Sequence, residues 1–172
     1  REYVGGLSGS MYKSSIENSF VKNSNISGLY YVSGITGLSF DGNISNSYSI
    51  NSITGHGHLS LLAAGIIDGK IQNSYSSGNI TFNWPIYFYN GGGLISLNFS
   101  NNTNIINSYY NNDQLNCEYF CNNQIGNTSS LYLFDSNWLE NNGWNFNSTW
   151  SNSTHNTQSP LLLWETQLTS AD

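Results

Sequence analysis

The chain has 172 residues, only 8% of them charged, and a formal net charge of −6. Four Lys and Arg residues cannot neutralise a row of phosphates, which argues against a nucleic-acid-binding protein. No apolar run approaches the roughly 20 residues needed to span a membrane. The 28 Asn, 28 Ser and 17 Gly residues disfavour a helical bundle, and 15% aromatic residues argue against a disordered chain.

Residues 4–110 contain an internal repeat. The motif Ile-x-Asn-Ser-aromatic occurs four times, with intervals of 28, 27 and 34 residues between its asparagines. Each copy follows a Gly-apolar segment, and each of the first three precedes an Asn/Ser-Ile-Ser/Thr unit. Ile, Val, Tyr and Thr favour strands, whereas Gly, Asn and Ser favour turns. Each repeat therefore predicts three short strands joined by polar or glycine-containing corners.

This period predicts an all-β fold, a parallel β-solenoid (β-helix) of about four coils with three short strands per coil. Coils in such a fold stack about 4.7–4.9 Å apart, so equivalent residues form columns. Like charges repeated down a stack would repel, which accounts for the low charge. The sequence predicts an inward aliphatic column of Ile16, Ile44, Ile71 and Ile105, an aromatic column of Phe20, Tyr48, Tyr75 and Tyr109, and an amide ladder of Asn18, Asn46, Asn73 and Asn107.

Two further features interrupt or accompany the repeat. The longer last interval indicates an insertion around residues 83–89, where an aromatic segment, 84–89, would bulge from the coil as a loop. The position three residues before each repeat isoleucine holds a charged or amide side chain, and Lys13 could pair with Asp41 in the next coil. These four residues are Lys13, Asp41, Asp68 and Asn102.

The chain divides into solenoid repeats over 1–110 and an irregular segment over 111–172 that packs on or caps the solenoid. Cys117 and Cys121 are four residues apart and could form a local disulfide in an oxidising compartment. Free thiols are the alternative, and a metal site is the least favoured, because further ligands are lacking nearby. Four tryptophans could cover the last coil: Trp138, Trp144, Trp150 and Trp164.

Several of these segments resemble the GLUG motif, which occurs in tandem in large bacterial and archaeal surface proteins, including haemagglutinin-like adhesins. The similar segments are Gly5-Gly6-Leu7-Ser8-Gly9, residues 71–81, Gly143-Trp144-Asn145-Phe146 and Ser159–Trp164. The resemblance covers about 4–110 as repeats and 136–165 as a terminal unit, although the second copy reads Ser33-Gly34-Ile35. It implies a surface-exposed solenoid stalk or adhesin and no particular chemistry.

Neither catalysis nor metal binding is predicted. Asp41 and Asp68 would lie in adjacent coils, but each precedes a glycine and is typical of an exposed turn; weak calcium binding is the alternative. His56 and His58 lack a third nearby ligand and are expected at the surface or in a turn. We therefore expect a protein that is not an enzyme, with no catalytic residue, no bound metal and no cofactor.

Sequons for N-glycosylation occur at eight asparagines. The 38 Ser and Thr residues among 172 would give about six sequons by chance, so eight is no enrichment. Occupancy is expected only in a chain from an archaeal or eukaryotic source. The eight sites are Asn25, Asn43, Asn79, Asn98, Asn101, Asn127, Asn147 and Asn152.

The sequence as a whole predicts a structural or interaction protein: a repeat unit of a secreted cell-surface adhesin or of a self-assembling extracellular filament. The first Gly-apolar segment begins at Val4 without a cap, so we expect end-to-end self-association or contact with neighbouring repeats of a longer chain. Nucleic acid and a membrane span are not expected. The alternative is a carbohydrate-binding or carbohydrate-processing β-helix that contacts surface glycans through Tyr30-Tyr31 or residues 84–89. Packing of these aromatic residues against a neighbouring coil or subunit is favoured over glycan binding.

Overall fold

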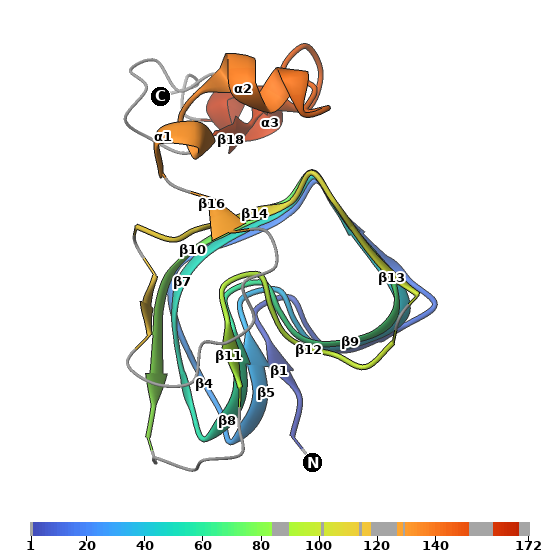
Figure 1. Ribbon diagram of the computed structural model, residues 1–172, viewed down its shortest axis with the longest axis vertical. Coiled ribbons are helices and arrows are strands. Elements are labelled where there is room, and N and C mark those ends of the chain that lie inside the picture. The colour runs from blue at the N-terminus through green and yellow to red at the C-terminus, as the bar shows by residue number, and fades with distance from the viewer. Residues whose placement is uncertain are drawn as a thin grey trace.

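The computed structural model describes residues 2–83, 90–100, 102–113, 115–117, 127–128, 130–151 and 160–168. The predicted all-β class is confirmed, because parallel sheets stack into a β-solenoid. Figure 1 looks along the stack, so that equivalent strands of successive layers lie behind one another. Three of the sheets run through the layers, which confirms three strands per layer.

Among the three solenoid sheets, the first has the shortest strands, of two to four residues. It has the order β1-β5-β8-β11 and is parallel throughout. Its strands are β1 (Val4–Gly5), β5 (Tyr30–Ser33), β8 (Gly57–Ser60) and β11 (Gly91–Gly92).

The second sheet forms the long side of each layer. It has the order β12-β9-β6-β2, with β3 paired to β6 and β13 paired to β9. Its strands are β2 (Ser8–Tyr12), β3 (Ser15–Glu17), β6 (Thr36–Ser45), β9 (Ala63–Gln72), β12 (Ile95–Asn98) and β13 (Thr103–Ile106).

The third sheet begins at the aromatic position of the repeat. It has the order β16-β14-β10-β7-β4, with β15 also paired to β10, so the solenoid sheets extend beyond residue 110. Its strands are β4 (Phe20–Ser27), β7 (Tyr48–Gly55), β10 (Tyr75–Phe82), β14 (Tyr109–Asn111), β15 (Asn116–Cys117) and β16 (Asn127–Thr128).

The solenoid has about three turns, where the sequence predicted about four coils. The four motif copies do lie in successive layers, but among the described residues only the second and third layers have an unbroken strand in the second sheet. In the second sheet β6 and β9 each run for ten residues, whereas the first layer is divided into β2 and β3 and the fourth into β12 and β13. Counting motifs therefore overstates the number of complete turns.

Side chains from all three sheets fill two adjoining interior clusters. One lies between the first and third sheets and includes Val32, Leu59 and Ile53. The other is lined by the second sheet and includes the buried Ile44 and Ile71 of the aliphatic column. Because alternate residues of a strand point to opposite faces, these inward residues are separated by outward polar ones.

The C-terminal unit contains short helices and a small antiparallel sheet. Asp135 caps α2 by accepting hydrogen bonds from the backbone N–H groups of Asn137 and Trp138, at 3.0 and 3.2 Å. In Figure 1 this unit lies beside the solenoid, above the start of the third sheet, and not on the end of the stack. Its elements are α1 (Ser130–Leu133), α2 (Ser136–Asn141), β17 (Trp150–Ser151), β18 (Leu161–Leu162) and α3 (Leu163–Leu168).

Candidate functional site

The aliphatic positions of the motif are in register from layer to layer. Ile16 pairs with Ile44, Ile44 with Ile71, and Ile71 with Ile105. Ile44 is 1% exposed and Ile71 is fully buried, whereas the two outer members are only partly buried. The interior of the stack is therefore best covered in its middle layers.

The aromatic positions form a second column, which faces away from the solenoid interior. Phe20, Tyr48 and Tyr75 stack nearly parallel, with ring centroids 5.1 and 4.9 Å apart and interplanar angles of 10° and 6°. Tyr48 and Tyr75 are fully buried because they pack against the C-terminal unit, in a cluster with Trp150. The column is therefore the surface on which that unit docks.

The asparagine column marks a sharp corner in each layer. All four residues adopt the left-handed backbone conformation, with φ of 47–48°, which asparagine tolerates better than most residues. Between side chains, the amide of Asn73 donates to the carbonyl oxygen of Asn46 at 3.5 Å, a long and weak hydrogen bond. The backbone conformation, more than an amide ladder, explains why asparagine recurs here. The four residues are Asn18, Asn46, Asn73 and Asn107.

A serine column lies directly after the asparagines, and the sequence analysis did not single it out. Each of these hydroxyls donates to the backbone carbonyl two residues earlier, at 2.8–2.9 Å. From the second layer on, the same hydroxyl accepts the backbone N–H of the serine in the preceding layer, at 3.2 Å. The invariant Ser of the repeated motif was the available signal. The column consists of Ser19, Ser47, Ser74 and Ser108.

Tryptophans of the C-terminal unit contact the asparagine corner of the solenoid in its first and fourth layers, and the aromatic column between them. The indole N–H of Trp164 donates to the backbone oxygen of Asn18 at 3.2 Å, and that of Trp144 donates to the backbone oxygen of Asn107 at 2.9 Å. Trp150 is fully buried against Tyr48 and Tyr75. The tryptophans were expected to cover the last coil, whereas these contacts run along the side of the stack.

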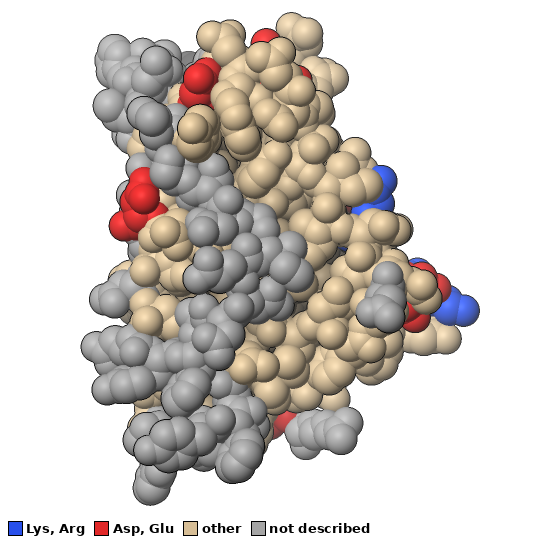
Figure 2. All heavy atoms as spheres, viewed as in Figure 1, with Lys and Arg blue, Asp and Glu red and all other residues tan. Residues whose placement is uncertain are grey.

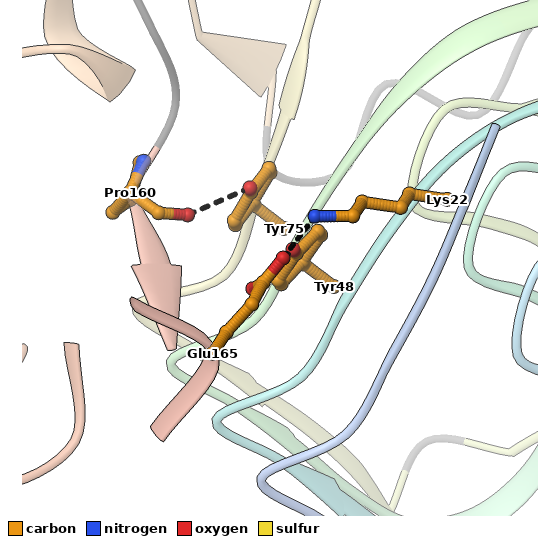
Figure 3. A network of polar contacts seen from close by, with 5 residues as sticks. All are labelled: Lys22, Tyr48, Tyr75, Pro160 and Glu165. Carbon is orange, nitrogen blue, oxygen red and sulfur yellow. Dashed lines mark hydrogen bonds and ion pairs between the residues drawn. The ribbon is translucent and has the colours of Figure 1, made fainter. Parts of the chain in front are cut away.

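A polar network joins the two parts of the molecule (Figure 3). Glu165, whose side chain is 7% exposed, forms an ion pair with Lys22 and accepts a hydrogen bond from the Tyr48 hydroxyl at 2.6 Å. The Tyr75 hydroxyl donates to the backbone oxygen of Pro160 at 2.8 Å. Burial raises the pKa of Tyr48 well above its ordinary value, and Tyr75 and the hydrogen bond to Glu165 act in the same direction. Neither Lys22 nor Glu165 carried a signal in the sequence.

The paired aspartates lie at a corner of the second sheet. Asp41 and Asp68 both adopt left-handed backbone conformations, with φ of 49° and 54°, and Asp68 accepts a hydrogen bond from the Ser100 hydroxyl. The expected pair between Lys13 and Asp41 is not among the ion pairs of the described residues. The Lys13 ammonium instead lies 5.5 Å from the centroid of the Tyr12 ring, a cation–π arrangement.

The histidine pair forms no ligand set in the described part of the chain. The ring of His58 packs against Tyr31 at a centroid distance of 4.8 Å, and burial lowers its pKa. Within the described residues, no three His, Cys, Asp or Glu side chains come close enough together to hold a metal ion. Tyr31 also contacts Tyr3 and Phe99, so the Tyr30-Tyr31 pair lies partly within an aromatic cluster.

The sequons fall mainly on exposed positions. Asn127 lies in β16, and Asn101 and Asn152 lie outside the described residues, as do Cys121 and residues 84–89. The disulfide between Cys117 and Cys121 and the role of the aromatic insertion therefore stay predictions. The exposed sequon asparagines are Asn25, Asn43, Asn79, Asn98 and Asn147.

The first layer supplies an edge strand to each of the three solenoid sheets: β1, β2 and β4. Its inward residues are less covered than their partners in the next layer. Ile26 is partly buried, whereas its partner Ile53 is fully buried, and Val4 and Val32 differ in the same way. Leu7, at the corner after β1, is 48% exposed. This layer is a candidate surface for another solenoid layer.

No described helix is long and apolar enough to cross a membrane. The chain matches no protein family, no curated protein and no solved structure. The likeness to GLUG-motif proteins therefore stays an expectation from the sequence.

Proposed function

We propose that this chain is a non-enzymatic structural and interaction unit of an extracellular surface protein, either a cell-surface adhesin or a self-assembling filament. The observation that carries the proposal is the first layer, whose strand edges and inward apolar residues lack a covering layer in the described structure. Unpaired strand edges are templates for pairing with another chain. The layer that covers this edge comes from a second copy or from neighbouring repeats of a longer chain.

The solenoid itself supports a mechanical role. Parallel strands pair in register over eight residues between β7 and β10, and columns of side chains run across all four layers. Repeat structures of this kind build extended, rigid shapes from contacts between neighbouring layers. The resemblance of the repeats to the GLUG motif supports a place on the cell surface.

The test is whether the purified chain stacks through its first layer. We expect its sedimentation coefficient to increase with concentration, and negative-stain electron microscopy to show solenoids joined along their axis. Lysines on the exposed edge residues, Ser10→Lys with Ser15→Lys, should abolish this association, since charged edges resist strand pairing. The matched control places lysines on exposed residues of the C-terminal unit, Asn141→Lys with Ser148→Lys, and should associate normally. Single solenoids at every concentration would contradict the self-assembling form of the proposal.

A further inference from the structure

An open groove of about 630 Å³ lies at the corner of the second sheet, on the outside of the solenoid. It begins beside Lys13 in the first layer and reaches Asn102 in the fourth. Three intervals between layers amount to about 14 Å, long enough for more than one sugar unit. Figure 2 shows acidic and basic atoms side by side at the right-hand edge of the molecule.

Aromatic rings form one wall of this groove. Tyr12 and Phe40 pair in adjacent layers and are 70% and 37% exposed. Elsewhere the same fold buries aromatic rings completely, as at Tyr48 and Tyr75. A contiguous exposed apolar patch can mark a binding surface. Tyr12 and Phe40 therefore offer exposed aromatic surface to a ligand, with the Lys13 ammonium 5.5 Å from the centroid of the Tyr12 ring.

Polar side chains of balanced charge line the rest of the groove. Asp41 and Asp68 supply two negative charges, and Lys13 and Lys70 supply two positive charges, so the net charge of the lining is zero. This balance gives no preference for a strongly charged ligand. Amide side chains add further donors and acceptors, and a neutral polyhydroxylated ligand could use all of them. The amides in the lining are Asn43, Asn102 and Asn104.

We propose that this groove binds a neutral polysaccharide. A pyranose ring has an apolar face of C–H groups that packs on an aromatic ring, here Tyr12 and Phe40. Its hydroxyl groups donate to the carboxylate of Asp41 and exchange hydrogen bonds with Asn43. The binding site is on the side of the solenoid, so it goes beyond the proposed stacking of layers and does not depend on it.

The test is native electrophoresis in gels that contain dextran, mannan or laminarin, with polygalacturonate as an anionic comparison. The chain is produced without N-glycosylation, because Asn43 lies in the groove and belongs to a sequon. We expect at least one neutral polysaccharide to retard the wild-type chain, and polygalacturonate to have no such effect. Tyr12→Ala should weaken the retention about tenfold, and Asp41→Asn should weaken it less.

The matched control is Tyr132→Ala, since Tyr132 is a 47%-exposed aromatic residue outside the groove. It should leave the retention unchanged. Thermal unfolding of Tyr12→Ala, which removes a largely exposed side chain, should match that of the wild type and exclude misfolding. The proposal is overturned if none of the three neutral polysaccharides retards the wild type, or if Tyr12→Ala is retarded as strongly as the wild type. It is also overturned if polygalacturonate retards the wild type as strongly as a neutral polysaccharide does.

Discussion

The solenoid and the C-terminal unit satisfy their polar groups in different ways. In the solenoid one solution recurs from layer to layer: the Ser47 hydroxyl, for example, donates to the backbone oxygen of Ser45 and accepts the N–H of Ser19. In the C-terminal unit each contact occurs once. Glu165 binds Lys22 and Tyr48, and Trp144 binds the backbone oxygen of Asn107. Stability in the first region is distributed among layers, whereas in the second it is concentrated in a few residues.

The aromatic column is where the two regions meet. Tyr48 and Tyr75 belong to the repeat by sequence and register, yet their rings are buried by the C-terminal unit. A repeated position therefore acquires unequal importance from layer to layer, depending on what packs against it. The following substitutions test this difference, beginning with the largest expected effect.

Tyr75→Ala should cause the largest loss. The ring is fully buried, stacks on Tyr48 and contacts Trp144 and Trp150, so its removal leaves a cavity between the two regions. We expect the free energy of unfolding to fall by about 3–5 kcal/mol, as for other buried aromatic truncations. Chemical denaturation measures this change.

Tyr75→Phe is the control, because it keeps the ring and removes the hydroxyl that donates to the backbone oxygen of Pro160; it should cost about 1 kcal/mol. Equal losses for the two variants would show that the hydroxyl, and not the ring, joins the regions.

Ser74→Ala should have the next largest effect. It removes a buried hydroxyl that donates to the oxygen of Gln72 and leaves the backbone N–H of Ser47 without its acceptor. A buried donor left unsatisfied costs about 1–3 kcal/mol. The change is measured by chemical denaturation against Ser10→Ala, which alters an exposed serine of the first layer. A loss no greater than that of Ser10→Ala would mean that the serine column contributes little to layer stacking.

Alkaline pH should weaken the fold by a smaller amount. Because the pKa of Tyr48 is raised in the folded state, its neutral form is favoured there, and stability is lost as pH rises above the unfolded pKa of about 10. One pH unit above that value should lower the free energy of unfolding by about 1 kcal/mol for this tyrosine. The measurement is chemical denaturation at a series of pH values.

Tyr48→Phe should make this pH dependence shallower without abolishing it, because burial also raises the pKa values of Tyr109 and Tyr110. The same slope in Tyr48→Phe and in the wild type would contradict the assignment to Tyr48.

Much of the solenoid could be predicted because its contacts recur at a fixed interval. The registers Ile44 with Ile71 and Tyr48 with Tyr75 follow from aligning the copies of the motif. The number of complete turns could not be counted in this way, since a motif can be present where its layer is interrupted, as between β12 and β13. The pairing of Lys13 with Asp41 also failed, because register fixes the positions of backbones and not the direction of a long side chain.

By itself, the sequence determined the all-β class, the three strands per layer and the residues that stack on one another. The fold in turn explains the high content of Asn and Ser, because asparagine suits the left-handed corner and the serine hydroxyl links one layer to the next. Only the tertiary structure decided which side of the aromatic column is covered, and by what. Lys22 and Glu165 are 143 residues apart in the sequence, and their contact occurs once. The repeat period therefore could not predict it. A repeated motif predicts contacts between neighbouring layers because the same residue types recur at a fixed interval. A single long-range contact has no such pattern and becomes visible only in the folded structure.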